Sequence, residues 1–214
     1  MNNCFQFHRW INTLPRLRFP FCEDQIPLNG IYILFEKGEL AHNTDRIVRI
    51  GTHTGINQLR SRLKQHFIAE NKDRSIFRKN IGRALLNKNH DPFLNQWELD
   101  LTSKDSKDKY YNLIDFDKQK SIEKTVTKYI QNNFSFVVLP IDDKDKRLAL
   151  ESKIISTIST CADCGPSKQW LGLYSPKEKI RKSGLWLVNE LYKQPLSEAD
   201  FQYLQKIANT FYKS

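Results

Sequence analysis

The chain has 214 residues, of which 39% are hydrophobic, 12% aromatic and 27% charged, and its formal net charge is +10. This length and composition are typical of one folded domain with a buried core, and they exclude an intrinsically disordered chain. The sequence contains neither a run of about 20 apolar residues nor an uninterrupted apolar leader, so we expect a soluble, cytoplasmic protein without a membrane span.

A hairpin is predicted after an N-terminal arm that covers residues 1–29. Residues 30–35 are rich in β-branched and aromatic side chains and predict a strand, and residues 37–39 predict a turn. Polar and apolar residues alternate in 46–51, which predicts a second strand. We expect these two strands to pair in antiparallel fashion.

Helical spacing of apolar residues begins after the hairpin. Leu59, Leu63 and Phe67 are four residues apart and predict a helix. Arg62 and His66 are also four apart, so we expect them on one helical face, about 5–6 Å apart at Cβ, where they could share one ligand. A second helix is predicted near residues 76–85, with Ser75 as a possible N-cap.

The second half of the chain alternates exposed and apolar segments. We expect an insertion at about 87–133, of which residues 102–120 lack any period and predict an exposed, partly disordered stretch. A helix near 122–130 and a central strand at 134–139 follow. The apolar face of the next helix, near 148–158, contains Glu151, and residues 191–214 predict a C-terminal helix.

The four cysteines do not by themselves form a recognisable site. Cys4 and Cys22 are too far apart in sequence for a zinc knuckle, and Cys161 with Cys164 is a weak signal when it stands alone. We expect free thiols in a reducing compartment, with structural zinc as the alternative.

Two segments carry most of the excess positive charge. Residues 56–88 contain nine basic and two acidic residues, a local net charge of +7, and residues 166–184 contain five and one, a net charge of +4. Charge concentrated in this way indicates a surface that binds phosphate groups of a polyanion.

A set of motifs resembles the GIY-YIG nuclease family. Gly30-Ile31-Tyr32 lies in the first predicted strand, Arg49-Ile50-Gly51 in the second, Arg62 and His66 on the following helix and Glu151 on a later one. The resemblance covers roughly residues 30–186. Within the family, the sequence is similar to restriction-type or stand-alone bacterial or phage members. It implies an α/β (α+β) fold with a small, mostly antiparallel sheet flanked by helices, and a catalytic domain over residues 30–190 with its active site on one face of the sheet.

The resemblance also implies a reaction, the hydrolysis of DNA phosphodiester bonds. Tyr32 would activate or position the attacking water, and Arg62 and His66 would contact the phosphate, which suits the planar, permanently charged guanidinium of arginine. Glu151 would bind Mg²⁺ or Mn²⁺, because a lone carboxylate on an apolar helix face is costly unless it binds a cation. Further DNA contacts are expected from basic residues of the same region, namely Arg60, Lys64, Arg74, Arg78 and Lys79. A dimer would be expected if the protein cuts both strands.

The chain departs from the family pattern at two positions. Arg49 stands where the family usually has a tyrosine, and it could bind phosphate or favour ionisation of Tyr32. The family also has an asparagine after the metal-binding helix, and Gln169 or Ser167 could stand in for it. The alternative function is therefore a catalytically inactive DNA-binding protein of the same fold. Restriction, repair and mobile-element or defence roles all remain open.

Overall fold

The structure is a computed structural model in which residues 3–213 are described, and its centre is a four-stranded sheet. The strands are β1 (Leu17–Arg18), β2 (Gly30–Ala41), β3 (Thr44–Gly51) and β4 (Phe134–Pro140). Their order across the sheet is β1-β4-β2-β3, and every neighbouring pair is antiparallel. The expected antiparallel sheet is confirmed, and β3 is one of its two edge strands.

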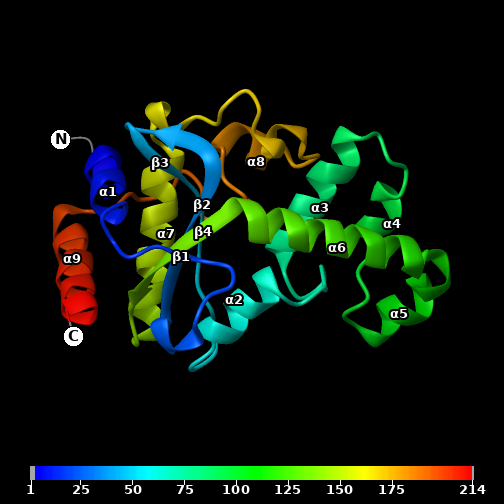
Figure 1. The fold of residues 1–214 in the computed structure, drawn as a ribbon, viewed down its shortest axis with the longest axis horizontal. Helices are drawn as coiled ribbons and strands as arrows, with labels where there is room; N and C mark the ends of the chain where they lie inside the picture. The colour runs from blue at the N-terminus through cyan, green and yellow to red at the C-terminus, as the bar shows by residue number, and fades with distance from the viewer. Residues whose placement is uncertain (1–2, 214) are drawn as a thin grey trace.

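Helices surround this sheet on both sides (Figure 1). Longer and shorter α-helices occur along the whole described chain: α1 (Asn3–Ile11), α2 (Leu59–Phe67), α3 (Ile76–Lys88), α4 (Leu94–Glu98), α5 (Lys104–Tyr110), α6 (Phe116–Asn133), α7 (Lys144–Ser159), α8 (Glu178–Ser183) and α9 (Glu198–Lys213). Short 3-10 helices lie between them: η1 (Glu23–Gln25), η2 (Tyr111–Leu113), η3 (Ala162–Cys164) and η4 (Leu171–Tyr174).

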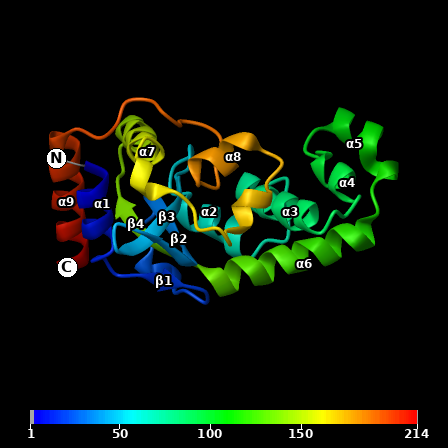
Figure 2. The ribbon, with the colours of Figure 1, turned by 90° about the horizontal axis from the view of Figure 1, so that it is seen from above.

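Two apolar clusters occupy the two faces of the sheet. Alternate residues of β2 point to opposite sides, so Ile31 and Ile33 belong to one cluster, and Tyr32 and Leu34 to the other. The first cluster is closed by α1, α7 and α9, and the second by α2, α3 and α6. Figure 2 shows this arrangement from above, with α1, α7 and α9 on one side of the strands and α2, α3 and α6 on the other. The fold is thus a helix–sheet–helix sandwich, as the resemblance implied.

The hairpin turn lies farther along the chain than predicted. Strand β2 passes through residues 37–39 and ends at Ala41, and the turn is made by His42 and Asn43, with φ angles of 54° and 58°. Two successive residues with positive φ are typical of the tight turn that joins twisted antiparallel strands. Gly38, with φ of 86°, lies where the register of β2 against β3 shifts between Phe35 and Leu40. This glycine therefore marks an irregularity within the strand pair, not the turn.

The segment expected to be an insertion is largely helical. Ser103 caps α5 by accepting a hydrogen bond from the Ser106 amide, and Asp115 caps α6 in the same way through the Lys118 amide. The later part of α6 reaches the core, because Val126 and Ile130 are buried beneath the sheet. Figures 1 and 2 both show α4 and α5 at the end of the molecule farthest from α1 and α9. In the part of the chain that is described, no helix is long and apolar enough to cross a membrane.

Candidate active site

The glycines of the two sequence motifs make room for their neighbours across the hairpin. A Cβ atom added at Gly51 would lie 2.2 Å from the hydroxyl oxygen of Tyr32, its partner in the register, and one at Gly30 would lie 2.3 Å from the carbonyl oxygen of Leu139. Both distances are far shorter than a van der Waals contact. Glycine at 51 therefore lets the Tyr32 ring lie across β3, and glycine at 30 lets β4 approach β2.

Tyr32 lies at the start of a buried chain of hydrogen bonds. Its hydroxyl oxygen is 2.8 Å from Nε2 of His66 on α2, and Nδ1 of His66 is 2.7 Å from the hydroxyl oxygen of Ser75. Ser75 is also the N-cap of α3, where its side chain accepts from the Arg78 amide. The predicted cap is confirmed, and it joins the start of α3 to the motif tyrosine.

His66 is held as a neutral ring. The side chain is fully buried, and burial lowers its pKa well below the ordinary range; the nearby charges of Arg49, Arg62 and Arg78 lower it further. Both ring nitrogens already have partners inside the protein. The histidine is thus arranged to orient the Tyr32 hydroxyl.

Arg49 occupies the position beside Tyr32 on the same face of the sheet. Its Nε donates to the Tyr32 hydroxyl oxygen at 3.4 Å, and Nη1 makes a short hydrogen bond to the carbonyl oxygen of Trp186. The guanidinium also lies 5.1 Å from the centre of the Phe77 ring. These contacts fix a positive charge next to the tyrosine oxygen.

Glu151 projects from α7 toward the same region but from the opposite helical layer. Burial raises the pKa of Glu151 to about 7, and the positive charge of Arg49 and the backbone N–H of Thr52 oppose this shift. The carboxylate of Glu190 raises the pKa as well, and Arg62 lowers it. The active site was expected on one face of the sheet, and this expectation needs correction. The candidate site extends around the edge strand β3, where the two helical layers meet.

A cavity of about 420 Å³ lies in this region and brings residues of four segments together. Arg49 comes from β3, Asn80 from α3, Glu151 from α7, and Asn189 and Glu190 from the chain after α8. Asn80 is almost fully buried, and its Oδ1 accepts from Arg83 at 2.6 Å. Among the described residues, no acceptor lies within hydrogen-bonding distance of Nδ2 of Asn80. The cavity wall thus contains an amide nitrogen that is buried and has no partner among the described residues.

Oxygen donors at this cavity suit a divalent cation. Mg²⁺ prefers carboxylate and amide oxygens and is often held by one or two protein carboxylates. Glu151 and Glu190 supply carboxylates, and Asn189 supplies an amide oxygen. Burial disfavours the ionised form of Glu151, so a bound cation would offset the free-energy cost of ionising this carboxylate inside the protein. The residues present thus fit such an ion.

Arg62 lies beside the cavity and faces a separate hollow of about 310 Å³ that also includes Thr52 and His53. Its Nη1 donates to Oε1 of Gln65 and to the carbonyl oxygen of Arg74, both at 3.0 Å. His66 turns inward from the same helix. The two side chains that sequence spacing placed on one face therefore have separate partners here, although Arg62 remains near enough to influence the charge of both His66 and Glu151.

The five basic residues expected at DNA divide into two groups. Arg74 and Lys64 are exposed and Arg60 is partly exposed, although Lys64 pairs with Glu23 at 2.7 Å and Arg60 donates to the Ile26 carbonyl. Arg78 and Lys79 are buried. Arg78 pairs with Glu123 at 2.6 Å, and Lys79 donates to the Glu98 carbonyl at 2.9 Å. Arg78 and Lys79 therefore lie outside any exposed phosphate-binding surface.

The two residues suggested in place of the family asparagine lie elsewhere. Ser167 donates to Oε1 of Glu39, and Gln169 is exposed beside a hollow that also includes Tyr129. Asn189 lines the cavity with Glu151 instead. Neither Asn189 nor Asn80 was predicted from the sequence. The sequence feature that could have indicated Asn189 is its position as an amide residue after α8. No sequence feature distinguishes Asn80, because it lies in an ordinary helix.

Comparison with known proteins gives one family. A family model described as a GIY-YIG domain matches residues 12–212. No curated protein and no solved structure matches the chain. The family match extends beyond the motifs to include β1 and nearly all of α9.

Proposed function

The chain belongs to the GIY-YIG family, whose domains are typically those of endonucleases, and on this basis we propose that it is a divalent-metal-dependent DNA endonuclease. The observation that carries the proposal is the position of Arg49. This residue contacts the Tyr32 hydroxyl and also lines the cavity that contains Glu151. The motif tyrosine and the carboxylate are thereby linked through one fixed positive charge.

In this proposal the scissile phosphate binds between the Glu151 cavity and Arg62. Arg62 contacts its non-bridging oxygens, since a guanidinium offers two parallel donors to a phosphate. Asn80 lines the same cavity, and its buried, unpaired amide nitrogen would donate to the phosphate if the side chain turned toward the cavity. These groups favour the transition state because negative charge grows on the phosphate oxygens during attack.

Tyr32 acts on the attacking water. Its oxygen already has two fixed neighbours, the neutral ring of His66 at 2.8 Å and the charged Nε of Arg49 at 3.4 Å. His66 thus positions the hydroxyl, a role that differs from the phosphate contact implied by the resemblance, and Arg49 stabilises negative charge on the oxygen. Tyr32 is fully buried and Arg49 links it to the cavity, so in this proposal the water approaches Tyr32 from the side of Arg49.

Glu151, with Asn189 as a neighbouring oxygen donor, is the proposed ligand of the divalent cation. When bound, Mg²⁺ or Mn²⁺ would supply positive charge to the phosphate and to the leaving 3′ oxygen. Glu151 itself contributes a carboxylate held on a regular helix, so its position does not depend on a flexible loop.

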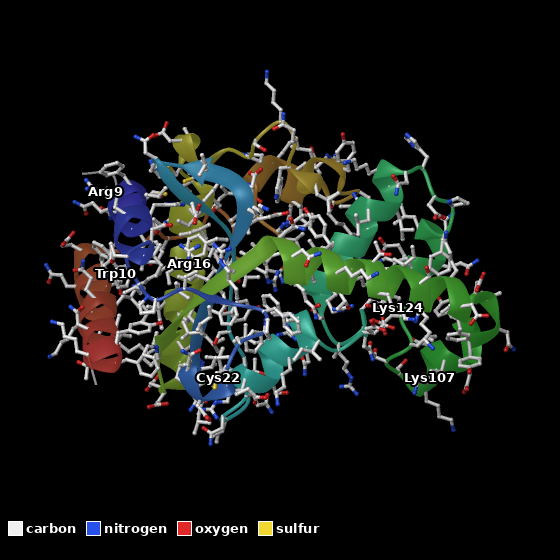
Figure 3. The ribbon with its side chains drawn as sticks, viewed as in Figure 1. Arg9, Trp10, Arg16, Cys22, Lys107 and Lys124 are labelled. Carbon is white, nitrogen blue, oxygen red and sulfur yellow. The ribbon has the colours of Figure 1, made fainter. Side chains whose placement is uncertain are left out.

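Cleavage of supercoiled plasmid tests the proposal. We expect nicked or linear DNA with Mg²⁺ or Mn²⁺ and no cleavage in EDTA. Arg62→Ala should abolish cleavage while changing DNA affinity by only several-fold, because one phosphate contact is a small part of binding. Arg9→Ala is the matched control, since Arg9 is exposed on α1, on the opposite side of the sheet (Figure 3). Wild-type cleavage by Arg62→Ala, or undiminished cleavage in EDTA, would contradict the proposal.

A second candidate, a DNA-binding protein without catalysis, draws on two observations. Arginine replaces the second motif tyrosine, and the Tyr32 hydroxyl is enclosed by protein. The same assay distinguishes the candidates. Retarded migration of DNA without any cleavage, with either cation and across a range of pH, would favour the second.

A further inference from the structure

A cluster of thiols and imidazoles lies on the face of the sheet opposite Tyr32 and has no part in the proposed reaction. Cys4 and His8 come from α1, His42 from the β2–β3 turn and Cys164 from η3. One ligand atom from each of these four residues lies within 4.8 Å of the other three. Cys4, His8 and Cys164 are buried, and His42 is partly buried. Segments far apart in the sequence thus bring four metal-binding side chains to one point.

We propose that Cys4, His8, His42 and Cys164 bind one structural zinc ion. The sulfur atoms of Cys4 and Cys164 are 3.2 Å apart, and Nε2 of His42 is 3.3 Å from the sulfur of Cys164. Nε2 of His8 is 4.0 Å from the sulfur of Cys164. Tetrahedral zinc with ordinary bond lengths separates its ligand atoms by about 3.3–3.8 Å. The cluster therefore needs only small movements to surround the ion.

The chemical character of the four groups suits zinc among the common divalent ions. Two thiolates and two imidazoles form one of the usual closed zinc sites, whereas Mg²⁺ prefers oxygen ligands. With four protein ligands no position remains for a substrate, so the site is structural.

The ring of His8 also contacts two backbone groups. Its Nδ1 lies 3.1 Å from the Cys4 carbonyl oxygen, and the Ile47 amide donates to Nε2 at 3.3 Å. A ring protonated on Nδ1 donates to the Cys4 carbonyl, an interaction that commonly orients zinc-bound histidines. Its Nε2 lone pair is then available to the metal, which would replace the rather long contact from the Ile47 amide.

The fold explains what such an ion would hold together. Cys4 and His8 are four residues apart and face the same way from α1. His42 lies in a turn with positive φ, and Cys164 follows the end of α7. Helix α1 packs against both β3 and α7. A zinc ion here would fasten the N-terminal helix to the hairpin and to the end of α7, and would leave the cavity at Glu151 to its own cation.

Two other cysteines provide matched controls. Cys161 lies at the edge of the cluster, with its sulfur 3.5 Å from Nε2 of His42, but it is not among the four residues whose ligand atoms all lie within 4.8 Å. Cys22 is exposed and lies near α2, away from α1 (Figure 3). The proposal requires both of these thiols to be dispensable for zinc binding.

Metal analysis of the full-length protein, purified under reducing conditions without chelator, tests the site. We expect about one zinc per chain in the wild type and in Cys22→Ser, Cys161→Ser and Glu151→Gln, and less than about 0.2 in Cys164→Ser and His42→Ala. Retention by Glu151→Gln separates this site from the proposed catalytic cation. Loss of zinc should also lower the thermal unfolding temperature, since binding energy at a structural site contributes to folding.

Wild-type protein allows the same test where a variant fails to fold. Protein refolded with Co²⁺ should show the visible absorption of a tetrahedral, thiolate-bound ion. A mercurial that modifies thiols should release zinc from the native protein in proportion to the amount of mercurial added. The proposal is overturned by wild-type protein that contains no zinc and gives no such absorption, or by a Cys4–Cys164 disulfide in protein kept reduced. Loss of zinc in Cys161→Ser with retention in His8→Ala would refute this set of ligands.

Discussion

At the scale of single residues, Glu151 is a carboxylate whose burial destabilises its ionised form and which is also the proposed ligand of a cation. Burial raises its pKa from the ordinary 4.5 to about 7. An acid whose pKa is higher in the folded protein than in the unfolded chain binds more protons when folded. The free energy of unfolding therefore decreases as pH rises from about 4.5 to about 7, because the ionised carboxylate is less well solvated in the fold. A cation beside it would offset this loss.

Glu151→Gln should therefore stabilise the metal-free protein at pH 8. Glutamine resembles the protonated acid, so the gain in the free energy of unfolding should be about 1–3 kcal/mol at pH 8 and less than about 1 kcal/mol at pH 5, where Glu151 is largely protonated in the folded protein. Urea denaturation in EDTA at the two pH values measures it. Added Mg²⁺ should stabilise wild type and not the variant. An equal difference between the two proteins at both pH values would show that Glu151 does not titrate near 7.

The sequence predicted the types of residue at the site better than their contacts. Tyr32, Arg49 and Glu151 approach one region because strand alternation and helix periodicity, both readable in sequence, set which way they face. The inward turn of His66 depends on Ser75, and the donor of Asn80 depends on how α3 packs on the sheet edge. Such pairings are fixed by tertiary packing, so spacing along one helix could not reveal them.

At the scale of elements, the clearest sequence patterns correctly predicted helices and strands. The apolar period of Leu59, Leu63 and Phe67 predicted α2, and the mainly apolar run before Pro140 predicted β4. The two-residue strand β1 was missed because a strand that short has no period to detect. Helix α5 was missed for a related reason: no residue of it is buried, so its polar sequence lacks an apolar stripe, and local capping by Ser103 stabilises its start.

A buried ion pair joins two of these elements. Arg78 on α3 donates to both the carboxylate and the backbone carbonyl oxygen of Glu123 on α6. It also donates to the hydroxyl oxygen of Thr127 on the same helix. Burial raises the pKa of Glu123 even though Arg78 opposes the shift, so desolvation is a large part of the energetics of this pair. Arg78 therefore belongs to the packing of α3 against α6, despite its place in the basic segment of the sequence.

Removing one partner of this pair should destabilise the fold strongly. We expect Arg78→Met to lower the free energy of unfolding by about 3–5 kcal/mol, because a buried carboxylate loses its cation. The double variant Arg78→Met/Glu123→Met should recover part of that loss. Urea denaturation measures both, with Arg74→Ala as an exposed control expected to change stability by less than about 0.5 kcal/mol. Wild-type stability in the Arg78→Met protein would contradict a structural role for the pair.

At the scale of the whole molecule, the net charge of +10 does not describe the surface that DNA would meet. Four of the nine basic residues between 56 and 88 are buried, and acidic side chains or backbone carbonyls hold their charges inside the protein: Lys72, Arg78, Lys79 and Arg83. Counting charges along the sequence thus overestimates the phosphate-binding surface, since sequence distance does not show which charges are paired within the fold.

This division of charges predicts how binding responds to salt. The logarithm of the DNA association constant falls linearly with the logarithm of salt concentration, with a slope near −0.9 for each phosphate contacted. Arg74 is exposed beside Arg62, which donates to its carbonyl oxygen, so Arg74→Ala should reduce the magnitude of the slope by about one unit. Lys79→Met removes an equal charge from the interior and should leave the slope unchanged, provided that binding is measured well below the unfolding temperature of this variant. Fluorescence anisotropy with a short duplex in EDTA, at salt concentrations from low to physiological, isolates binding from cleavage. Equal slopes for wild type and Arg74→Ala would exclude Arg74 from the DNA surface, and a reduced slope for Lys79→Met would show that the buried lysine becomes exposed to DNA in the complex.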